Sequence, residues 1–362
     1  HILCYMFDVL VKIYEDYGYT AREAVENIVE KNLWGLDIDE RASQLSYFAV
    51  MMKARQYDRR FFNKKDDNGK LCIPQPHVYA IEESNGITSA PMHDMGIGLS
   101  QEDYGKAVKE AMRLVEEMHD AKEYGSIIHI TPCDWNLLRR FAVPRWISEG
   151  QMRMDIHGEI MASERLQVLI NIGETLSQKY DVVVTNPPYM GNMPVKMTEL
   201  VQRDYPESKY DLYAVFMEKA LSMTRKNRFT SLITQHSWMF ISSFEKFRRN
   251  LQGKDYVSLL HLGTRAFEEI GGEVVQTVSM VFRNSYIADS VVAANRLVDY
   301  SDAESKEKAY LNKECHFSIK QKNFDLLPGN PIVYWLAEEY FDALQNTSCI
   351  ETLVERKAGV DR

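Results

Sequence analysis

The sequence predicts an α/β fold, in which an open, mostly parallel sheet carries helices on both of its faces. Apolar, strand-like runs alternate with amphipathic helix-like segments along most of the 362 residues. The run at 180–185 is rich in β-branched residues, which is typical of a central parallel strand. Polar and aromatic residues follow several of these runs, at the sheet edge where such folds bind ligands. We expect strands at 33–37, 126–131, 181–185, 229–234, 257–262 and 274–282, the last two antiparallel.

Composition fits a large folded chain. Hydrophobic residues make up 45% of it, and low-complexity tracts and repeats are absent from the sequence. No apolar run approaches the length of about 18 residues that a membrane span needs. The cysteines are odd in number and lack CxxC spacing, which favours reduced thiols in a cytoplasmic protein over disulfides or a metal site. They stand at positions 4, 72, 133, 315 and 349.

The N-terminal region predicts helices around a strand. Gly18 ends the first helix, and Thr20 with Glu23 has the capping-box spacing that begins a second. The strand at 33–37 follows, and Asp39 is placed to cap the helix after it.

An insertion is predicted at 63–125. It opens with a polar turn cluster at 63–70, and Ser100 is placed to cap an amphipathic helix later in the insertion. Residues 71–99 show no clear pattern, whereas 146–178 show a long helical one.

The tetrapeptide Asn186-Pro187-Pro188-Tyr189, here called the NPPY motif, directly follows the strand at 181–185. The side-chain oxygen of Asn186 and the carbonyl of Pro187 could each accept one N–H of a planar amino group. The prolines fix the backbone and remove competing donors, and Tyr189 offers a face for stacking worth about 1–3 kcal/mol per base. A proline-rich turn that only closes the strand is the simpler alternative. We interpret the motif as a catalytic site that holds an amino or amide nitrogen.

With this motif the chain resembles the amino-methyltransferases, which move a methyl group from S-adenosylmethionine to an exocyclic nitrogen. The resemblance implies a Rossmann-like S-adenosylmethionine-dependent methyltransferase fold with no metal. It also implies that Asp37, at the end of the second family strand, binds the cofactor ribose and that Ile38 lies against the adenine. By the same resemblance, Asp134 accepts a hydrogen bond from the adenine amino group and Trp135 lies near the cofactor. An ordinary turn is the alternative for the last two residues.

The segment at 209–221 has the spacing of a helix with one buried face. It resembles the corresponding helix of the gamma-class N6-adenine DNA methyltransferases, in which a Phe packs on the cofactor adenine. Phe216 takes that position here, although a core aromatic would look the same. The same family places an aromatic that stacks on the target base between its last strands, and Phe267 takes that place.

Within this class the chain is most similar to the long adenine-specific methyltransferases of BREX phage-defence systems, the PglX type. The similarity rests on HIL…FDVL…IYE, NLWGLDIDERASQLSYFAVMMKAR and SWMFISSFEKFR, and covers most of residues 1–290. It implies a site-specific DNA methyltransferase that acts on N6 of an adenine flipped out of the helix. The implied partners are double-stranded DNA, bound through the full-length protein, and other subunits of the defence system.

The resemblance also suggests a domain organisation. Residues 1–62 are the N-terminal part of the methyltransferase core, whose first strand and glycine-rich loop we expect upstream of residue 1. The insertion at 63–125 is partly helical, 126–290 complete the core with the NPPY motif, and 291–362 extend toward a target-recognition domain. Because backbone amides of such a loop contribute much of cofactor binding, we expect this chain alone to bind the cofactor weakly and to be inactive.

Other functions remain open. Methyltransferases that modify a protein glutamine use the same tetrapeptide to hold a side-chain amide. A non-catalytic scaffold that binds DNA or protein is a second alternative. The intact Asp37, Asp134 and NPPY motif argue against a scaffold.

The net charge predicts the affinity of this chain for DNA. Its formal charge is −9, and phosphate neutralisation dominates nonspecific affinity, so we expect weak duplex binding by this chain alone. A mobility-shift assay at moderate salt measures this, and tight binding would contradict it.

Overall fold

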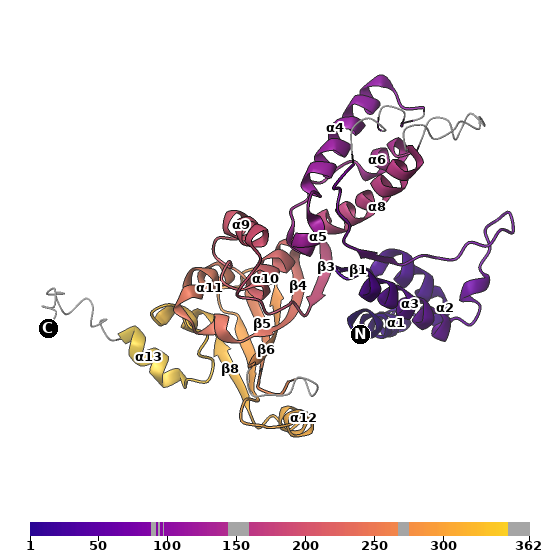
Figure 1. The fold of residues 1–362 in the computed structure, drawn as a ribbon. Coiled ribbons are helices and arrows are strands. Elements are labelled where there is room, and N and C mark those ends of the chain that lie inside the picture. Colours follow the sequence, from indigo (N-terminus) through magenta and orange to yellow (C-terminus); the bar gives the residue numbers. More distant parts are fainter. Residues whose placement is uncertain (88–91, 93–94, 97, 144–158, 267–274, 347–362) are drawn as a thin grey trace, which may run out of the picture. The chain divides into compact units, whose positions relative to one another are not determined.

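The computed structural model describes residues 1–87, 92, 95–96, 98–143, 159–266 and 275–346. The chain divides into two compact units, His1–Gln178 and Lys179–Arg362, each with its own sheet (Figure 1). The predicted α/β class is confirmed. Within the described residues, no helix is long and apolar enough to cross a membrane, and no group of three potential ligands is placed to hold a metal ion.

Three helices of the first unit pack around a shared apolar core. They are α1 (Ile2–Asp16), α2 (Ala21–Asn27) and α3 (Glu40–Tyr57). The predicted capping box is confirmed, since Thr20 and Glu23 each bond to the backbone of the other. Core side chains come from every one of these helices, including Phe7, Val11, Ala24, Val25, Val50 and Ala54.

The sheet of the first unit has two parallel strands, β1 (Trp34–Asp37) and β2 (His77–Ala80). Trp34 lies opposite His77, and their rings stack with centroids 3.8 Å apart. Strand β1 was predicted, whereas β2 lies in the stretch that the sequence leaves unassigned. A strand of four residues is too short for alternation to identify it.

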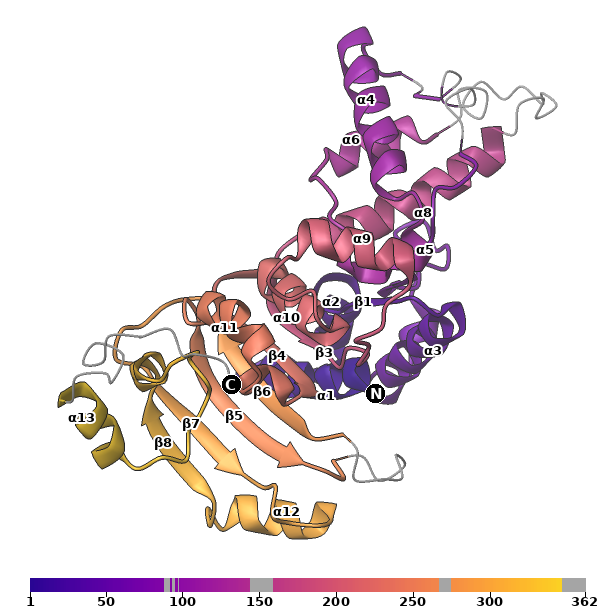
Figure 2. The ribbon, with the colours of Figure 1, turned by 60° about the vertical axis from the view of Figure 1, so that its left-hand side comes forward.

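Among its described residues the first unit also contains four further α-helices, of which α4, α6 and α8 contact one another (Figures 1 and 2). Ser100 caps α4 as predicted, accepting from the Asp103 amide. The predicted strand at 126–131 is wrong, because a 3-10 turn and irregular backbone replace it. Its isoleucines are nevertheless buried, so the apolar pattern reported burial rather than strand pairing. The helices are α4 (Gln101–Glu117), α5 (Ala121–Tyr124), α6 (Trp135–Phe141) and α8 (Glu159–Ser177).

The second unit contains a six-stranded sheet with the order β3-β4-β6-β5-β7-β8 (Figure 2). This sheet is mixed rather than mostly parallel, because β6 runs antiparallel between β4 and β5, and β8 runs antiparallel to β7. The predicted antiparallel pairing of β5 with β6 is confirmed. The strands are β3 (Tyr180–Thr185), β4 (Thr224–Gln235), β5 (Asp255–Gly263), β6 (Thr277–Arg283), β7 (Val291–Arg296) and β8 (His316–Lys320).

Strand β3 differs from its predicted central position. Among the described residues it pairs with β4 alone, so it forms an edge of this sheet. Asp181 and Val182 are exposed there. The opposite edge is longer than predicted, because β7 and β8 come from the segment expected only to connect to another domain.

One face of this sheet packs against helices and the C-terminal segment. Alternate residues of β4 and β6 are buried, among them Leu232, Met280 and Phe282, and they join a cluster with α10 and α11. The helices of this unit are α9 (Val195–Asp204), α10 (Leu212–Met223), α11 (Glu245–Leu251), α12 (Ala303–Leu311) and α13 (Glu338–Asn346).

Arg248 of α11 joins three segments of the second unit. Its side chain is 1% exposed and donates five hydrogen bonds, all to backbone carbonyls. Two go to Trp238 and Ile241, in the loop after β4, at 2.8 and 2.7 Å. The others go to Gly329 and Asn330, in the C-terminal segment. Burial lowers the pKa of the guanidinium, so these carbonyls are what stabilise its charge.

Replacing Arg248 should therefore destabilise the protein strongly. We expect Arg248→Met to lower the free energy of unfolding by at least about 3 kcal/mol, because it leaves buried carbonyls without donors. The neighbouring Arg249 is exposed, so Arg249→Met should cost less than about 1 kcal/mol. Urea unfolding measures both variants, and equal losses would contradict this assignment.

Candidate functional site

The NPPY motif follows β3 at the carboxyl end of the strand. Asn186 and Pro188 are exposed, Pro187 is buried, and Tyr189 is half-buried against the main core cluster. Pro187 and Tyr189 thus anchor the motif to the core. Its other side faces outward, as a binding site requires.

Asp211 binds the backbone of Met190, the residue directly after the motif. Its Oδ1 accepts hydrogen bonds from the amides of Met190, at 2.9 Å, and of Tyr213, at 3.3 Å. The Leu212 amide also donates to the Met190 carbonyl at 3.1 Å. Asp211 is the N-cap of α10, so one carboxylate ties the start of this helix to the end of the motif. Burial raises the pKa of Asp211, and the amide donors oppose that rise.

The Tyr189 ring is oriented by a second tyrosine. It meets Tyr213 edge to face, with centroids 6.0 Å apart and planes at 89°. The Tyr213 hydroxyl in turn hydrogen-bonds Ser237 Oγ at 2.7 Å, after β4. The Tyr189 hydroxyl is buried without a partner among the described residues, and burial raises the pKa of Tyr189 to about 12.

Two acceptors of the motif have no donor among the described residues. Within the described part of the chain, neither Asn186 Oδ1 nor the Pro187 carbonyl accepts a hydrogen bond. A carbonyl and an amide oxygen beside an aromatic ring can receive the two N–H groups of a planar amine. This is the chemistry that the sequence predicts for the motif.

The two other aromatic predictions stand differently. Phe216 is a half-buried residue of α10 and does not belong to the main core cluster. This partial exposure is what an aromatic side chain that faces a ligand would have. Phe267 lies outside the described residues. The role of each stays a prediction.

In the first unit, Asp37 lies at the carboxyl end of β1, as predicted. Its Oδ1 accepts from the Asp39 amide at 2.9 Å, and no described residue donates to Oδ2. Ile38 beside it is 53% exposed. Asp39 caps α3 by accepting from the Arg41 and Ala42 amides, which confirms that prediction. An open carboxylate oxygen beside an exposed apolar side chain suits a ribose and a base.

Asp134 has partners for both of its oxygens. Oδ1 accepts from the Leu137 amide as the N-cap of α6, and Oδ2 pairs with Lys106 at 3.0 Å. These contacts, the amide first, lower the pKa of Asp134. Trp135 packs toward Gly173 of α8, where an added Cβ would lie 3.1 Å from its ring. Both residues therefore have structural contacts, and their cofactor roles stay predictions.

The sequence analysis missed a chain of two histidines and a tyrosine. His236 follows β4, His261 lies near the end of β5, and Tyr334 comes from the C-terminal segment. His236 Nδ1 lies 2.8 Å from His261 Nε2, and His261 Nδ1 lies 2.9 Å from the Tyr334 hydroxyl. His261 and Tyr334 are buried and His236 is half-buried. Their wide separation in the sequence left no signal to find them by.

Burial sets the protonation states of His236, His261 and Tyr334. It lowers the pKa of His261 to about 3 and also lowers that of His236, so both rings are neutral near pH 7. The buried Tyr334 hydroxyl has His261 Nδ1 as its acceptor, and leaving it unpaired would cost about 1–3 kcal/mol. Tyr334 therefore donates to His261, and His261 Nε2–H donates to His236 Nδ1. His236 then carries its own proton on Nε2.

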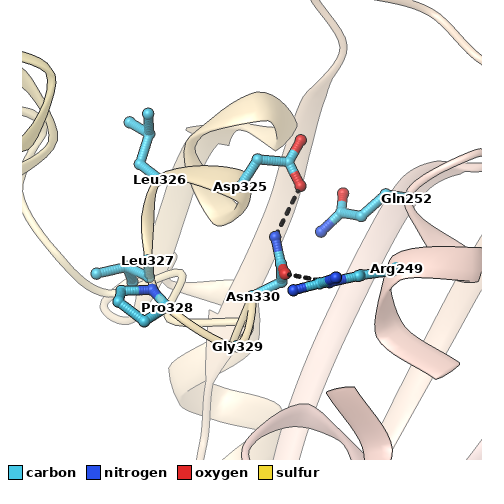
Figure 3. Close-up of a pocket in the computed structure, with 8 residues that line it drawn as sticks. All are labelled: Arg249, Gln252, Asp325, Leu326, Leu327, Pro328, Gly329 and Asn330. Carbon is cyan, nitrogen blue, oxygen red and sulfur yellow. Dashed lines mark hydrogen bonds between the residues drawn. The ribbon is translucent and has the colours of Figure 1, made fainter. Parts of the chain in front are cut away.

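A cavity of 460 Å³ lies elsewhere in the second unit, between α11 and the C-terminal segment (Figure 3). Asn330 bridges its walls, accepting from Arg249 and donating to Asp325. None of the predicted site residues lines it. The cavity is lined by the positively charged Arg249 and the negatively charged Asp325, so it lacks the uniformly positive lining of a phosphate site.

Comparison with known proteins assigns the family. The model of the Eco57I restriction-modification methylase matches residues 31–267. The chain belongs to the Eco57I restriction-modification methylase family. The matched region contains Asp37, Asp134, the NPPY motif and Phe216.

Individual relatives agree with the family. The adenine-specific methyltransferase PglX of Lacticaseibacillus casei (strain Zhang) is 37% identical to this chain over 99% of its length. The adenine-specific methyltransferase BrxX of Escherichia coli O9:H4 (strain HS) is 34% identical over 97% of it. The chain spans 30% of the length of each relative. The resemblance to the PglX type is confirmed.

Solved structures resemble this chain more distantly. One is a nuclease-deletion mutant of the Type ISP restriction-modification enzyme LlaGI in complex with a DNA substrate mimic. It is 12% identical, with a TM-score of 0.45, and the match covers 91% of this chain and 27% of that one.

Removing the Tyr189 hydroxyl tests how this ring is used. We expect Tyr189→Phe to raise the free energy of unfolding by about 1 kcal/mol, because it removes a buried, unpaired hydroxyl. Thermal or urea unfolding measures the change. Tyr213→Phe is the matched control and should destabilise the protein, because it breaks the bond to Ser237. A loss of stability in Tyr189→Phe would show that the hydroxyl has a partner.

Proposed function

We propose that this chain forms the catalytic region of a DNA methyltransferase that transfers a methyl group from S-adenosylmethionine to N6 of an adenine flipped out of the helix. The observation that carries the proposal is the NPPY motif, in which Asn186 and Pro187 have acceptors without a donor among the described residues, beside the fixed ring of Tyr189. The family match and the names of the relatives support it.

The acceptors activate the nitrogen. Its lone pair is delocalised into the purine ring, so the free amine is a weak nucleophile. Hydrogen bonds from the two N–H groups to Asn186 Oδ1 and the Pro187 carbonyl favour a pyramidal nitrogen and direct its lone pair out of the ring plane. Tyr189 stacks on the base and fixes its distance from the acceptors. A proton leaves the nitrogen after the methyl group has arrived, so no strong base is required.

The residues of the first unit fit the cofactor. Asp37 Oδ2 is open to a ribose hydroxyl, and the exposed Ile38 offers an apolar surface to the adenine. Asp134, Trp135 and Phe216 are the further candidates for cofactor contact. When bound, S-adenosylmethionine supplies the methyl group as an electrophile.

The relatives support a proposal for the setting of the reaction. We place the intact protein in the cytoplasm, where it would mark host DNA within a BREX-type phage-defence or restriction-modification system, together with other subunits. Double-stranded DNA would be its partner. Phe267 is the candidate for stacking on the flipped base.

Replacing Asn186 tests this proposal. We expect Asn186→Ala in the intact protein to reduce methyl transfer at least about 100-fold, because one of two activating acceptors is lost. Stability should be unchanged, because Asn186 is exposed and without partners among the described residues. Asn192→Ala is the matched control, since Asn192 is also exposed but lies outside the motif.

Two measurements give the outcome. Single-molecule sequencing of DNA from cells with the wild-type or variant protein reports the modified base and its sequence context. Tritium transfer from labelled cofactor to DNA or to protein reports the acceptor. Methylation of a protein glutamine with none on DNA, or wild-type DNA methylation by Asn186→Ala, would contradict the proposal.

A further inference from the structure

His236 and the NPPY motif both lie where parallel strands of the sheet have their carboxyl ends. Strands β3 and β4 are parallel neighbours, and Thr185 pairs with Leu232. Both strands therefore point their carboxyl ends the same way, and β4 continues for three residues past that level before His236. Residues that follow neighbouring parallel strands line one ligand-binding edge.

A second connection joins the two through α10. Tyr213 contacts the Tyr189 ring and bonds to Ser237, the residue after His236. The motif and the histidine are thus held by one helix, which limits how far apart they can move.

We propose that His236 is a specificity-determining residue, whose Nε2–H donates a hydrogen bond to a ring nitrogen of the base that the NPPY motif holds. This inference rests on the proposed function and deepens it. Nδ1 of His236 is occupied by His261, whereas Nε2 has no partner among the described residues. The half-buried ring has one nitrogen left for a ligand, and that nitrogen carries a proton.

A donor at this place complements adenine. The motif takes both hydrogens of the amino group, so the base has only acceptors left, its ring nitrogens N1, N3 and N7. A donor of fixed direction pairs with one of them without reorganisation.

His261 and Tyr334 are positioning residues for this contact. They fix the tautomer of His236 from buried sites and do not themselves reach the base. Tyr334 belongs to the segment after Pro331, which returns to the sheet edge and bonds to Met239 through the Ile332 amide. The C-terminal segment thereby completes the site.

Deaza analogues of adenine test the contact. The intact protein is assayed on duplexes that carry adenine, 1-deazaadenine, 3-deazaadenine or 7-deazaadenine at the target position found by sequencing. We expect one analogue to lower kcat/KM about tenfold for the wild type, because it replaces the accepting nitrogen by C–H. His236→Ala should lose that discrimination, and His236→Gln, which keeps an N–H donor, should recover part of it.

Two further variants separate the contact from a structural role. Tyr334→Phe leaves the tautomer of His261 unfixed and should reduce the discrimination between analogues. His316→Ala is the matched control, because His316 lies on the edge strand β8 and bonds to Asn295 of β7 rather than to the two histidines and Tyr334, and it should discriminate as the wild type does.

The outcomes are distinct. If His236→Ala and the wild type discriminate equally among the four bases, the inference is overturned while the proposed function stands. If the wild type methylates no DNA at all, the proposed function fails and this inference fails with it.

Discussion

The carboxylate of Asp211 is the contact on which the candidate site depends. It accepts from the Tyr213 amide at the start of α10 and, with the same oxygen, from the amide of Met190 just after the motif. A helix N-terminus needs acceptors whatever the function, so this cap couples a requirement of folding to the placement of Tyr189. The Tyr213 ring, two residues along the helix, then sets the angle of the Tyr189 ring.

The C-terminal segment contacts the carboxyl ends of strands β4 and β5 in two ways. Arg248 binds the carbonyls of Gly329 and Asn330 together with those of the loop after β4. Tyr334, slightly further along, reaches His261. The segment is therefore part of the folded unit, and strands β7 and β8 before it extend the same sheet.

How much the sequence could predict depends on whether a feature is local. The capping residues Thr20, Asp39 and Ser100 act within one helical turn, and all three are confirmed. The NPPY motif and Asp37 stand at strand ends for the same local reason. The isoleucines of 126–131 show the limit, because a buried apolar run need not find a strand partner. The histidine chain was beyond reach, because its members meet only through tertiary contacts.

The edge position of β3 has a consequence for the motif that follows it. Among the described residues no strand pairs with the outer side of β3, so an extended segment could add to the sheet there. Asp181, paired with Arg225 and Arg228, places charge at the beginning of that edge, whereas 182–185 carry none. Pro187 and Pro188 have no N–H to continue a ladder. An added strand would find no N–H donor at Pro187 and Pro188, so its pairing is favoured only up to Asn186, and this backbone pairing uses neither the side-chain oxygen of Asn186 nor the carbonyl of Pro187.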